Sequence, residues 1–429
     1  MAGGKRWFSS MRGLALAALA LALLAGTPLG AQQLLVPMDR DQANHLKAYG
    51  LTYWVLRQGL TAEWLLNYRA GSFLLPDQPA IRREAALRGV TVATASVGDI
   101  ARIRATIAES NMEVVILEKA PQIAVYTPQN ASPWDDAVTL ALTYAEVPYE
   151  EVWDPEVLQG RLADYDWLHL HHEDFTGQYS KFYINYGGAP WLREEMRRNE
   201  SIAAEFGLPH VPALKGAVAR EIRRYVAEGG FLFAMCTATE TIDLALAAEN
   251  VDIAAPFSDG TPIDPSATER MDWSLGFAFQ NAVMQTNPTI NSFSDIDGHQ
   301  VNTPWREPLG AFTLFEFSAK FDPVPSMLVQ NHEAVIPDFY GLTTSYRRER
   351  LKPGVIVLAE ERGTPWAKYI HGNFGDGTWT FLAGHDPEDP QHHVGDEPTD
   401  LDLHPHSAGY RLILNNVLFP AARKRELRT

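Results

Sequence analysis

The chain has 429 residues and a formal net charge of −17 at pH 7, and 46% of its residues are hydrophobic. Such an acidic protein is repelled by nucleic acids and by anionic membrane surfaces, so we expect neither as a partner. The length allows two domains or one large domain with a sizeable core. Because the sequence contains one cysteine, Cys236, an internal disulfide is excluded.

Residues 1–31 have the pattern of a secretory signal peptide. Lys5, Arg6 and Arg12 form a basic start, an apolar stretch rich in leucine and alanine follows, and a possible cleavage point lies after Ala31. The apolar stretch is too short to span a bilayer, and no later stretch is long and apolar enough. We therefore expect export to the periplasm or the extracellular space, without an integral membrane segment in the mature protein.

The next segment, 32–120, is predicted to be an additional N-terminal α/β module. Strand-like runs alternate with helical patterns: strands are predicted at 34–36, 62–68, 91–97 and 113–118, and helices at 44–59, 79–88 and 98–109. This alternation is typical of α/β proteins with a parallel sheet.

The alternating pattern restarts after Pro121 and continues to about residue 420. Predicted strands lie at 122–128 and 164–174, and predicted helices at 134–147, at 214–230 and from about 407 to 418. The stretch from about 251 to 330 is rich in proline, aspartate and aromatic residues and is interpreted as an irregular insertion. Two strand-like runs flank the turn at 375–377, which predicts a hairpin.

Cys236 lies between the apolar run FLFAM and a helical pattern. Thr237 and Glu240 have the spacing of a capping box, so a helix is expected to begin directly after the cysteine. This order places the cysteine at the carboxyl edge of a parallel sheet, where ligands bind in open α/β folds. Backbone N–H groups there would favour a thiolate and an oxyanion. The alternative is that Cys236 is a small buried hydrophobic residue.

Histidines and carboxylates gather in two segments. His169 and His171 share one face of a predicted strand, and His172, Glu173 and Asp174 follow at its end. The second segment, 385–406, contains His385, His392, His393 and His404 among Asp386, Glu388, Asp389, Asp396, Asp400 and Asp402. Such side chains could bind a divalent metal. Because neither segment has the spacing of a helical zinc site, a solvated acidic loop is the alternative for the second.

Residues 121–420 resemble the class I glutamine amidotransferase-like superfamily, on the strength of the cysteine after FLFAM and the late strand TWTFLAGHDPED. The resemblance implies a doubly wound, mostly parallel, flavodoxin-like sheet. It also implies that Cys236 is the nucleophile, that His385 is its base, and that Glu388 or Asp386 orients the imidazole.

The strand DYDWLHLHHED takes the place of the family strand that forms part of the oxyanion hole, so His171, His172 and Glu173 are expected to line the substrate pocket. Ala234 and Ala238 stand where the family elbow has glycines. That departure makes the chain more similar to exported relatives near the trehalose-utilisation-like proteins than to glutamine-specific enzymes.

We therefore expect an exported hydrolase or transferase that acts on a small polar or carbohydrate-related molecule, by carbon–nitrogen bond chemistry through a thioester and without a cofactor. Chains that resemble this one over their whole length carry the name asparagine synthetase B. Such synthetases need an N-terminal cysteine in the mature protein and a Ser-Gly-Gly-x-Asp-Ser loop, and this chain has neither.

Two other functions stay open. The chain could be a non-catalytic ligand- or glycan-binding protein that keeps the fold and has lost the site. It could also be a metal-dependent hydrolase centred on the histidines. The aromatic residues of FYINYGGAPW, at 182–191, could stack on a sugar ring or belong to the core.

Overall fold

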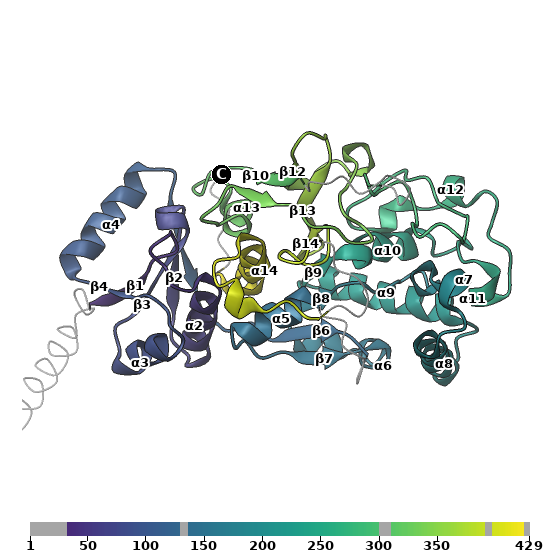
Figure 1. The fold of residues 1–429 in the computed structure, drawn as a ribbon, viewed down its shortest axis with the longest axis horizontal. Coiled ribbons are helices and arrows are strands. Elements are labelled where there is room, and N and C mark those ends of the chain that lie inside the picture. Colours follow the sequence, from purple (N-terminus) through teal and green to yellow (C-terminus); the bar gives the residue numbers. More distant parts are fainter. Residues whose placement is uncertain (1–31, 129–135, 300–309, 391–396, 424–429) are drawn as a thin grey trace, which may run out of the picture.

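The computed structural model describes residues 32–128, 136–299, 310–390 and 397–423 (Figure 1). The predicted signal peptide lies outside these residues, as do His392, His393 and Asp396. The described residues form two β-sheets accompanied by helices, which confirms the α/β class. Within them, no helix combines the length and the apolar character that crossing a membrane requires.

The first sheet has five strands in the order β4-β1-β3-β2-β5. Its strands are Gln33–Val36 (β1), Ala62–Leu66 (β2), Ser72–Pro76 (β3), Ala93–Ala95 (β4) and Glu113–Leu117 (β5). All neighbouring strands are antiparallel, so the parallel arrangement expected for this segment is wrong. The physical reason lies in β3, which is absent from the predicted strands: its short connection to β2 allows only antiparallel pairing.

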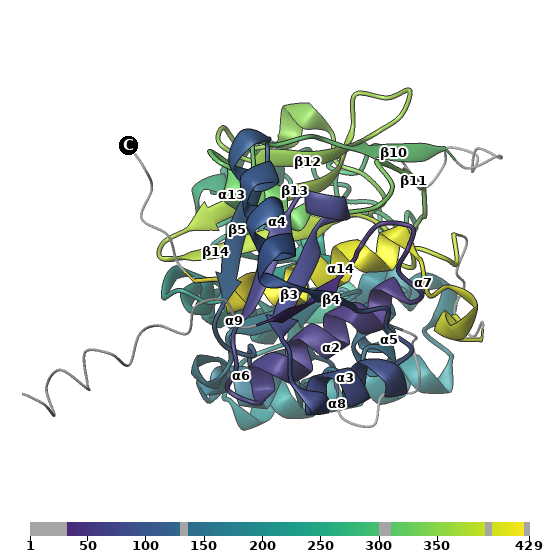
Figure 2. The ribbon, with the colours of Figure 1, turned by 90° about the vertical axis from the view of Figure 1, so that its left-hand side faces the viewer.

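Helices cover both faces of this first sheet (Figure 2). They are His45–Arg57 (α2), Pro79–Leu87 (α3) and Val97–Glu109 (α4). Leu35, Leu65 and Leu74 pack against Ile103 and Ile107 of α4. Residues of the opposite face pack with α2 and α3 and join the larger core of the protein. The sheet is therefore buried on both sides by alternating side chains.

The second sheet has nine strands in the order β11-β10-β12-β13-β14-β9-β8-β6-β7. They are Ile123–Tyr126 (β6), Glu150–Val152 (β7), Trp167–Leu170 (β8), Phe231–Met235 (β9), Ala311–Leu314 (β10), Val335–Pro337 (β11), Ile356–Glu361 (β12), Ala367–Phe374 (β13) and Gly377–Leu382 (β14). The strands from β14 to β7 are parallel, whereas those from β11 to β14 are antiparallel. The sheet is thus mixed, which corrects the expectation of a mostly parallel sheet. The predicted hairpin at 375–377 is confirmed by the β13–β14 pairing.

The parallel strands bury alternate side chains in two separate cores. On one face, the helices are Ala137–Tyr144 (α5), Pro323–Leu328 (α13) and Ala408–Leu418 (α14); on the other, they are Asp154–Leu158 (α6), Val211–Ala227 (α9) and Cys236–Ala247 (α10). Further helices are Tyr183–Tyr186 (α7), Pro190–Glu205 (α8), Pro256–Asp259 (α11) and Ala267–Arg270 (α12). Helices on both faces make this part of the sheet doubly wound.

The first sheet and its helices contact the rest of the protein through a group of histidines around Arg411 of α14. The fully buried Arg411 guanidinium donates hydrogen bonds to Met38 O at 2.8 Å and to Ala70 O, and its Nη1 lies 3.2 Å from His332 Nδ1. The His45 ring stacks on His332 with 4.1 Å between centroids. His45 Nδ1 also lies 3.0 Å from His406 Nδ1. We refer to His45, His332, His406 and Arg411 as the arginine-bound histidines.

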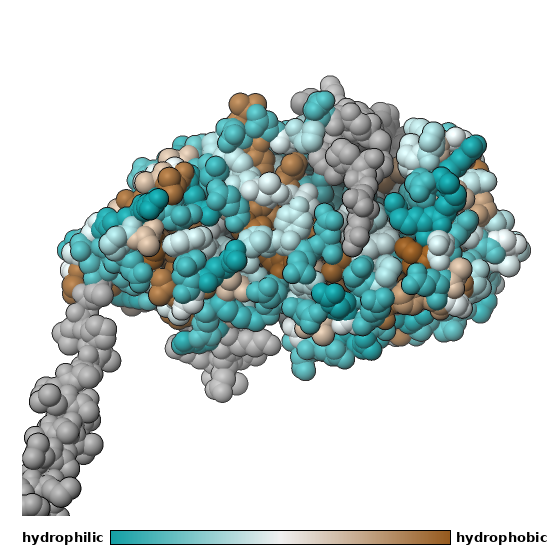
Figure 3. All heavy atoms as spheres, turned by 90° about the horizontal axis from the view of Figure 1, so that it is seen from below, coloured by the Kyte–Doolittle hydropathy of each residue, from teal (hydrophilic) through white to brown (hydrophobic). Residues whose placement is uncertain are grey.

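The face of the molecule shown in Figure 3 is mainly hydrophilic, with hydrophobic residues scattered over it. Within the aromatic segment 182–191, Tyr186 is 51% exposed and Trp191 is 37% exposed. Phe182 packs against a small buried cluster that includes Tyr179 and Leu192. The segment is therefore part core and part surface.

Candidate functional site

Three parallel strands end level with one another and bring the predicted site residues to one edge. Leu170 of β8 pairs with Ala234 of β9, and Met235 of β9 pairs with Leu382 of β14. The residues that follow these strand ends are His171 and His172, Cys236, and, after a short interval, His385. The structure therefore places them at the carboxyl edge, where open α/β sheets bind ligands.

Cys236 occupies the junction between β9 and α10 in a left-handed backbone conformation, with φ 51°. This conformation is uncommon for a residue with a side chain, and such strain concentrates at functional sites. The predicted capping box is wrong: Met235 is the N-cap and makes no side-chain cap. Glu240 is bound elsewhere, because it accepts hydrogen bonds from Ser294 Oγ at 2.6 Å and Thr343 Oγ1 at 3.0 Å.

The Cys236 thiol is 2% exposed. Burial raises its pKa, and hydrogen bonds from the backbone of Leu342, Thr237 and Thr343 offset only part of that effect. The same backbone groups would stabilise negative charge on a nearby atom. The direction of this pKa shift is opposite to the lowering that a helix N-terminus favours, because burial is the larger effect.

A loop at 338–346 packs between Cys236 and the strand end that carries His385. A Cβ placed on Gly341 would lie 3.0 Å from Cys236 Sγ and 3.1 Å from His385 N. Tyr340 O accepts a hydrogen bond from His385 N at 2.8 Å. The thiol and the backbone of His385 are therefore neighbours, and only a glycine fits between them.

His171, His172 and His385 form a compact group, which we call the edge histidines. The ring centroids of His171 and His385 are 4.4 Å apart, and those of His172 and His385 are 6.2 Å apart. One ring nitrogen from each residue lies within 4.8 Å of the other two. His171 is buried, and the other two are partly buried. His171 and His172 thus lie beside His385 at the same edge of the sheet.

Asp136, which was not among the predicted site residues, orients His171. It is the N-cap of α5 and accepts hydrogen bonds from Val138 N at 2.7 Å and Thr139 N at 3.3 Å. Its Oδ1 also lies 3.1 Å from His171 Nδ1. Since Nδ1 is bound in this way, the nitrogen of His171 left for a ligand is Nε2, which is buried without a hydrogen-bond partner among the described residues.

His169 holds Asp136 from the other side. Its Nε2 lies 3.3 Å from Asp136 Oδ2, and its Nδ1 lies 3.1 Å from Phe233 O. Burial alone would raise the pKa of Asp136, but His171 and His169, by charge and by hydrogen bonding, hold it well below its usual range. Asp136 is therefore a carboxylate shared by two buried imidazoles.

Glu173 lies beside His171, as predicted from the sequence. Its Oε2 accepts a hydrogen bond from His171 N at 2.9 Å, and burial raises its pKa to about 7. The next residue, Asp174, folds the following loop by accepting bonds from the backbone of Thr176, Gln178 and Ser180.

The two carboxylates predicted to orient His385 bind other groups. Asp386 Oδ1 accepts hydrogen bonds from the backbone N–H groups of Glu388 and Asp389, and its Oδ2 accepts from Thr399 Oγ1 and Tyr410 OH. Glu388 pairs with His404 Nδ1 at 3.2 Å. In the contacts described for them, both carboxylates stabilise the C-terminal segment, whereas Asp136 performs the orienting role for His171.

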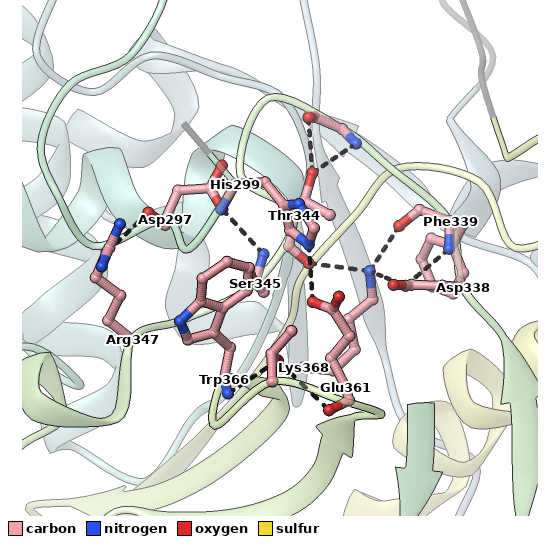
Figure 4. Close-up of polar contacts among 12 residues, drawn as sticks. Asp297, His299, Asp338, Phe339, Thr344, Ser345, Arg347, Glu361, Trp366 and Lys368 are labelled. Atoms are coloured by element: carbon pink, nitrogen blue, oxygen red, sulfur yellow. Dashed lines mark hydrogen bonds and ion pairs between the residues drawn. The ribbon is translucent and has the colours of Figure 1, made fainter. Parts of the chain in front are cut away.

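A second group of imidazole and carboxylates includes Asp338 of the 338–346 loop (Figure 4). His299 Nε2 is 2.8 Å from Glu361 Oε2, and both residues come within 4.8 Å of Asp338. Here the buried Lys368 Nζ already contacts Asp338 Oδ1 at 2.7 Å and donates to Phe339 O and Thr344 O. This lysine supplies the positive charge and fixes the loop that covers Cys236.

A surface depression lies at the opposite edge of the sheet. It is lined by Asp166 and Gly230, which precede β8 and β9, and by Tyr165 and Arg224. It is therefore separate from the edge histidines and contains none of the predicted site residues.

No family model matches the chain, and no curated protein matches it. Solved structures do match, at low similarity. A cytoplasmic protein of Salmonella typhimurium is 11% identical, with 71% of this chain and 100% of that chain covered and a TM-score of 0.35. A candidate GMP synthase subunit from Thermoplasma acidophilum is 9% identical, with 70% and 94% covered and a TM-score of 0.34. A beta-galactosidase of Bacillus circulans is 12% identical, with 63% and 29% covered and a TM-score of 0.24. Function is therefore inferred from the geometry of this chain.

Proposed function

We propose that the chain is an exported hydrolase that cleaves a carbon–nitrogen bond in a small polar substrate at the carboxyl edge of β8, β9 and β14. The observation that carries this proposal is the convergence of the three edge histidines within 4.8 Å, beside a cysteine in a left-handed conformation. Imidazoles exchange protons near neutral pH, which hydrolysis requires. Asp136 supplies the carboxylate that orients one of them.

The proposed fold type is flavodoxin-like, with membership of the class I glutamine amidotransferase-like superfamily. Along the chain, the parallel strands come in the order β6, β7, β8, β9, β14. Across the sheet they lie in the order β7-β6-β8-β9-β14, so the second strand comes first, followed by the first, third, fourth and fifth. Ligands bind where such an order reverses, here between β6 and β8. Asp136 follows β6 and His171 follows β8, so the pair flanks that position. We propose 32–120 as a separate module and 121–420 as the amidotransferase-like domain.

Two nucleophiles are available to such a hydrolase. In the thiol route, Cys236 Sγ attacks the carbonyl carbon, the amine leaves with a proton, and water then hydrolyses the thioester. In the water route, water adds to the carbonyl carbon directly, and the carbon–nitrogen bond breaks as a proton passes to the nitrogen. The left-handed Cys236 favours the first route, whereas its burial and raised pKa favour the second.

The test is the release of ammonia or amine from a panel of small amides and N-acetylated amino sugars. We expect His171→Gln and His385→Gln to lower kcat/KM by about 100-fold or more. The matched control is His404→Gln, because His404 contacts Glu388 outside the edge histidines. Turnover that survives both histidine substitutions, or no turnover on any such bond, contradicts the proposal.

The cysteine variant separates the two routes. Cys236→Ala abolishes turnover in the thiol route and leaves most of it in the water route. Iodoacetamide labelling gives an independent readout, because the chain has one thiol. Slow labelling of the native protein at pH 6–7 and rapid labelling in denaturant are expected from the buried, protonated thiol. Rapid native labelling that stops the reaction supports the thiol route.

Export has its own test. N-terminal sequencing of protein recovered from the periplasm or the medium is expected to begin at Gln32. Recovery of a chain that still carries residues 1–31 in the cytoplasm contradicts export.

A further inference from the structure

We propose that the three edge histidines bind a divalent transition-metal ion, with zinc as the best-fitting class, and that the hydrolase described above is metal-dependent. The use of the metal rests on the proposed function, whereas its binding rests on the residues alone. The donors are three imidazoles, a set that suits zinc and leaves a fourth position open to water.

The spacing of the donors is close to that of a metal site. Nitrogens bound to one tetrahedral zinc at about 2.0–2.1 Å lie about 3.4 Å apart. One ring nitrogen from each of His171, His172 and His385 lies within 4.8 Å of the other two. His172 and His385 follow strand ends and lie in connecting segments, outside the regular elements.

Asp136 gives His171 the second contact that metal-binding imidazoles have. Such histidines donate their other ring N–H to a carboxylate, which fixes the tautomer and the ring orientation. Here His171 Nδ1 lies 3.1 Å from Asp136 Oδ1. The Nε2 atom of this 1% exposed residue has no hydrogen-bond partner within the part of the chain that the structure describes. A buried polar atom without a partner costs free energy, and a bound ion would satisfy it.

Asp136 is itself fixed, so the orientation of His171 does not depend on a mobile side chain. Two N–H groups of α5 and the His169 imidazole hold its carboxylate. The group around His299 differs, because the Lys368 ammonium already lies against Asp338 there and occupies the place of a cation. That difference makes His299 a matched control for metal binding.

A metal at this position would serve hydrolysis by lowering the pKa of its bound water and by polarising a carbonyl oxygen. The oxygen of that water adds to the carbonyl carbon, and the carbon–nitrogen bond breaks. One proton of the water ends on the leaving nitrogen, so the products are a carboxylic acid and an amine. No oxidant or reductant is needed.

The experiment measures zinc in the full mature chain. After chelator treatment and reloading, elemental analysis is expected to find about one zinc per chain, and competition with a chromophoric chelator gives the affinity. We expect His171→Gln, His172→Gln and His385→Gln each to weaken binding about 100-fold or more, and Asp136→Asn to weaken it about 10–100-fold. His299→Gln and His404→Gln are expected to leave it unchanged.

Cobalt(II) provides a readout that does not depend on activity or on a single variant. The cobalt-loaded protein is expected to show the visible absorption of a nitrogen-bound tetrahedral ion, and His385→Gln to lose it. If His171→Gln fails to fold, the partly buried His172 and His385 still test the site.

The outcomes separate the two proposals. Zinc binding that depends on the edge histidines, without turnover on any carbon–nitrogen bond, overturns the hydrolase and keeps the metal site. Full turnover by metal-free protein overturns metal dependence and keeps the hydrolase. Retention of zinc in all three histidine variants, or loss of zinc in His299→Gln, overturns the assignment of the ligands.

Discussion

The edge histidines and the arginine-bound histidines are two groups of three imidazoles with opposite electrostatic surroundings. His171 of the first group contacts the carboxylate of Asp136. His332 of the second group contacts the guanidinium of Arg411. Burial, and after it the charge of Arg411, lowers the pKa of His45 to about 3 and that of His332 to about 4. A carboxylate beside a group of imidazoles favours a bound cation, whereas a guanidinium opposes one.

The largest expected effect comes from removing the positive charge of the second group. Arg411→Met is expected to lower the free energy of unfolding by about 3–5 kcal/mol, because it leaves the carbonyl groups of Met38 and Ala70 buried without their donor. Urea denaturation measures the loss. The matched control is Arg40→Met: its ion pair with Glu333 is exposed, so about 0–1 kcal/mol is expected. Equal effects of the two substitutions would contradict the structural role of Arg411.

The next prediction concerns zinc binding by the edge histidines. Zinc at 100 times its dissociation constant is expected to raise the free energy of unfolding by about 2.7 kcal/mol, because only the folded chain assembles the site. Thermal denaturation with and without zinc measures this gain. His385→Gln should abolish it, whereas His332→Gln should retain it. Loss of the gain in His332→Gln would mean that the arginine-bound histidines bind the ion instead.

A smaller effect is expected at the glycine that separates Cys236 from His385. Gly341→Ala places a methyl group 3.0 Å from Cys236 Sγ and 3.1 Å from His385 N, so we expect a loss of about 1–3 kcal/mol. The zinc affinity should fall with it, because the strand end that carries His385 is displaced. Gly310→Ala is the control, since a Cβ there meets no atom of the described residues within 4 Å. An unchanged stability in Gly341→Ala would contradict the close packing of this loop.

The last effect, which is absent at neutral pH, is a change in the acid dependence of stability. The folded-state pKa values of His45 and His332 lie below the ordinary value of 6.5, so the unfolded chain binds protons more readily. Stability is therefore lost as pH falls from about 6.5 toward 4 and then 3. Arg411 and His406 oppose protonation of both rings, and Glu333 favours that of His332.

Replacing one of these rings isolates its share of the acid dependence. His332→Gln is expected to reduce the slope of unfolding free energy against pH by up to one proton, about 1.4 kcal/mol per pH unit, between pH 4 and 6. Denaturant titrations at several pH values measure the slope. An identical slope in the variant and the parent would show that His332 is not held neutral by its surroundings.

The sequence allowed the meeting of the edge histidines to be predicted, because parallel strands end at a common edge and His171, His172 and His385 follow two such strands. It did not reveal Asp136, which the helical pattern placed inside a helix rather than at its N-cap. An aspartate at the start of a helix that follows the first parallel strand is the signal that could have found it. The antiparallel pairing of strands in the first sheet was also not predicted, because strand pairing depends on contacts between residues that are distant in the sequence.

The roles given to Glu388 and Asp386 show a limit of reasoning from spacing. Both follow His385 closely in the sequence, yet the contacts described for them are with Thr399, Tyr410 and His404. Sequence proximity does not decide which side of the chain a carboxylate faces. The raised pKa of Cys236 is a similar case, because the sequence indicates a helix N-terminus but not the loop from 338 to 346 that buries the thiol.

The position of β14 between β9 and β13 has a consequence for when the site can exist. His172 and His385 are far apart along the chain, and they meet only after the β13–β14 hairpin has docked beside β9. Contacts between such distant segments form late in folding. A chain in which this hairpin has not docked therefore lacks the proposed ion site. Under the proposal above, an ion can bind only once the sheet is complete, and the ions present at that stage, together with ligand preference, would determine which metal binds.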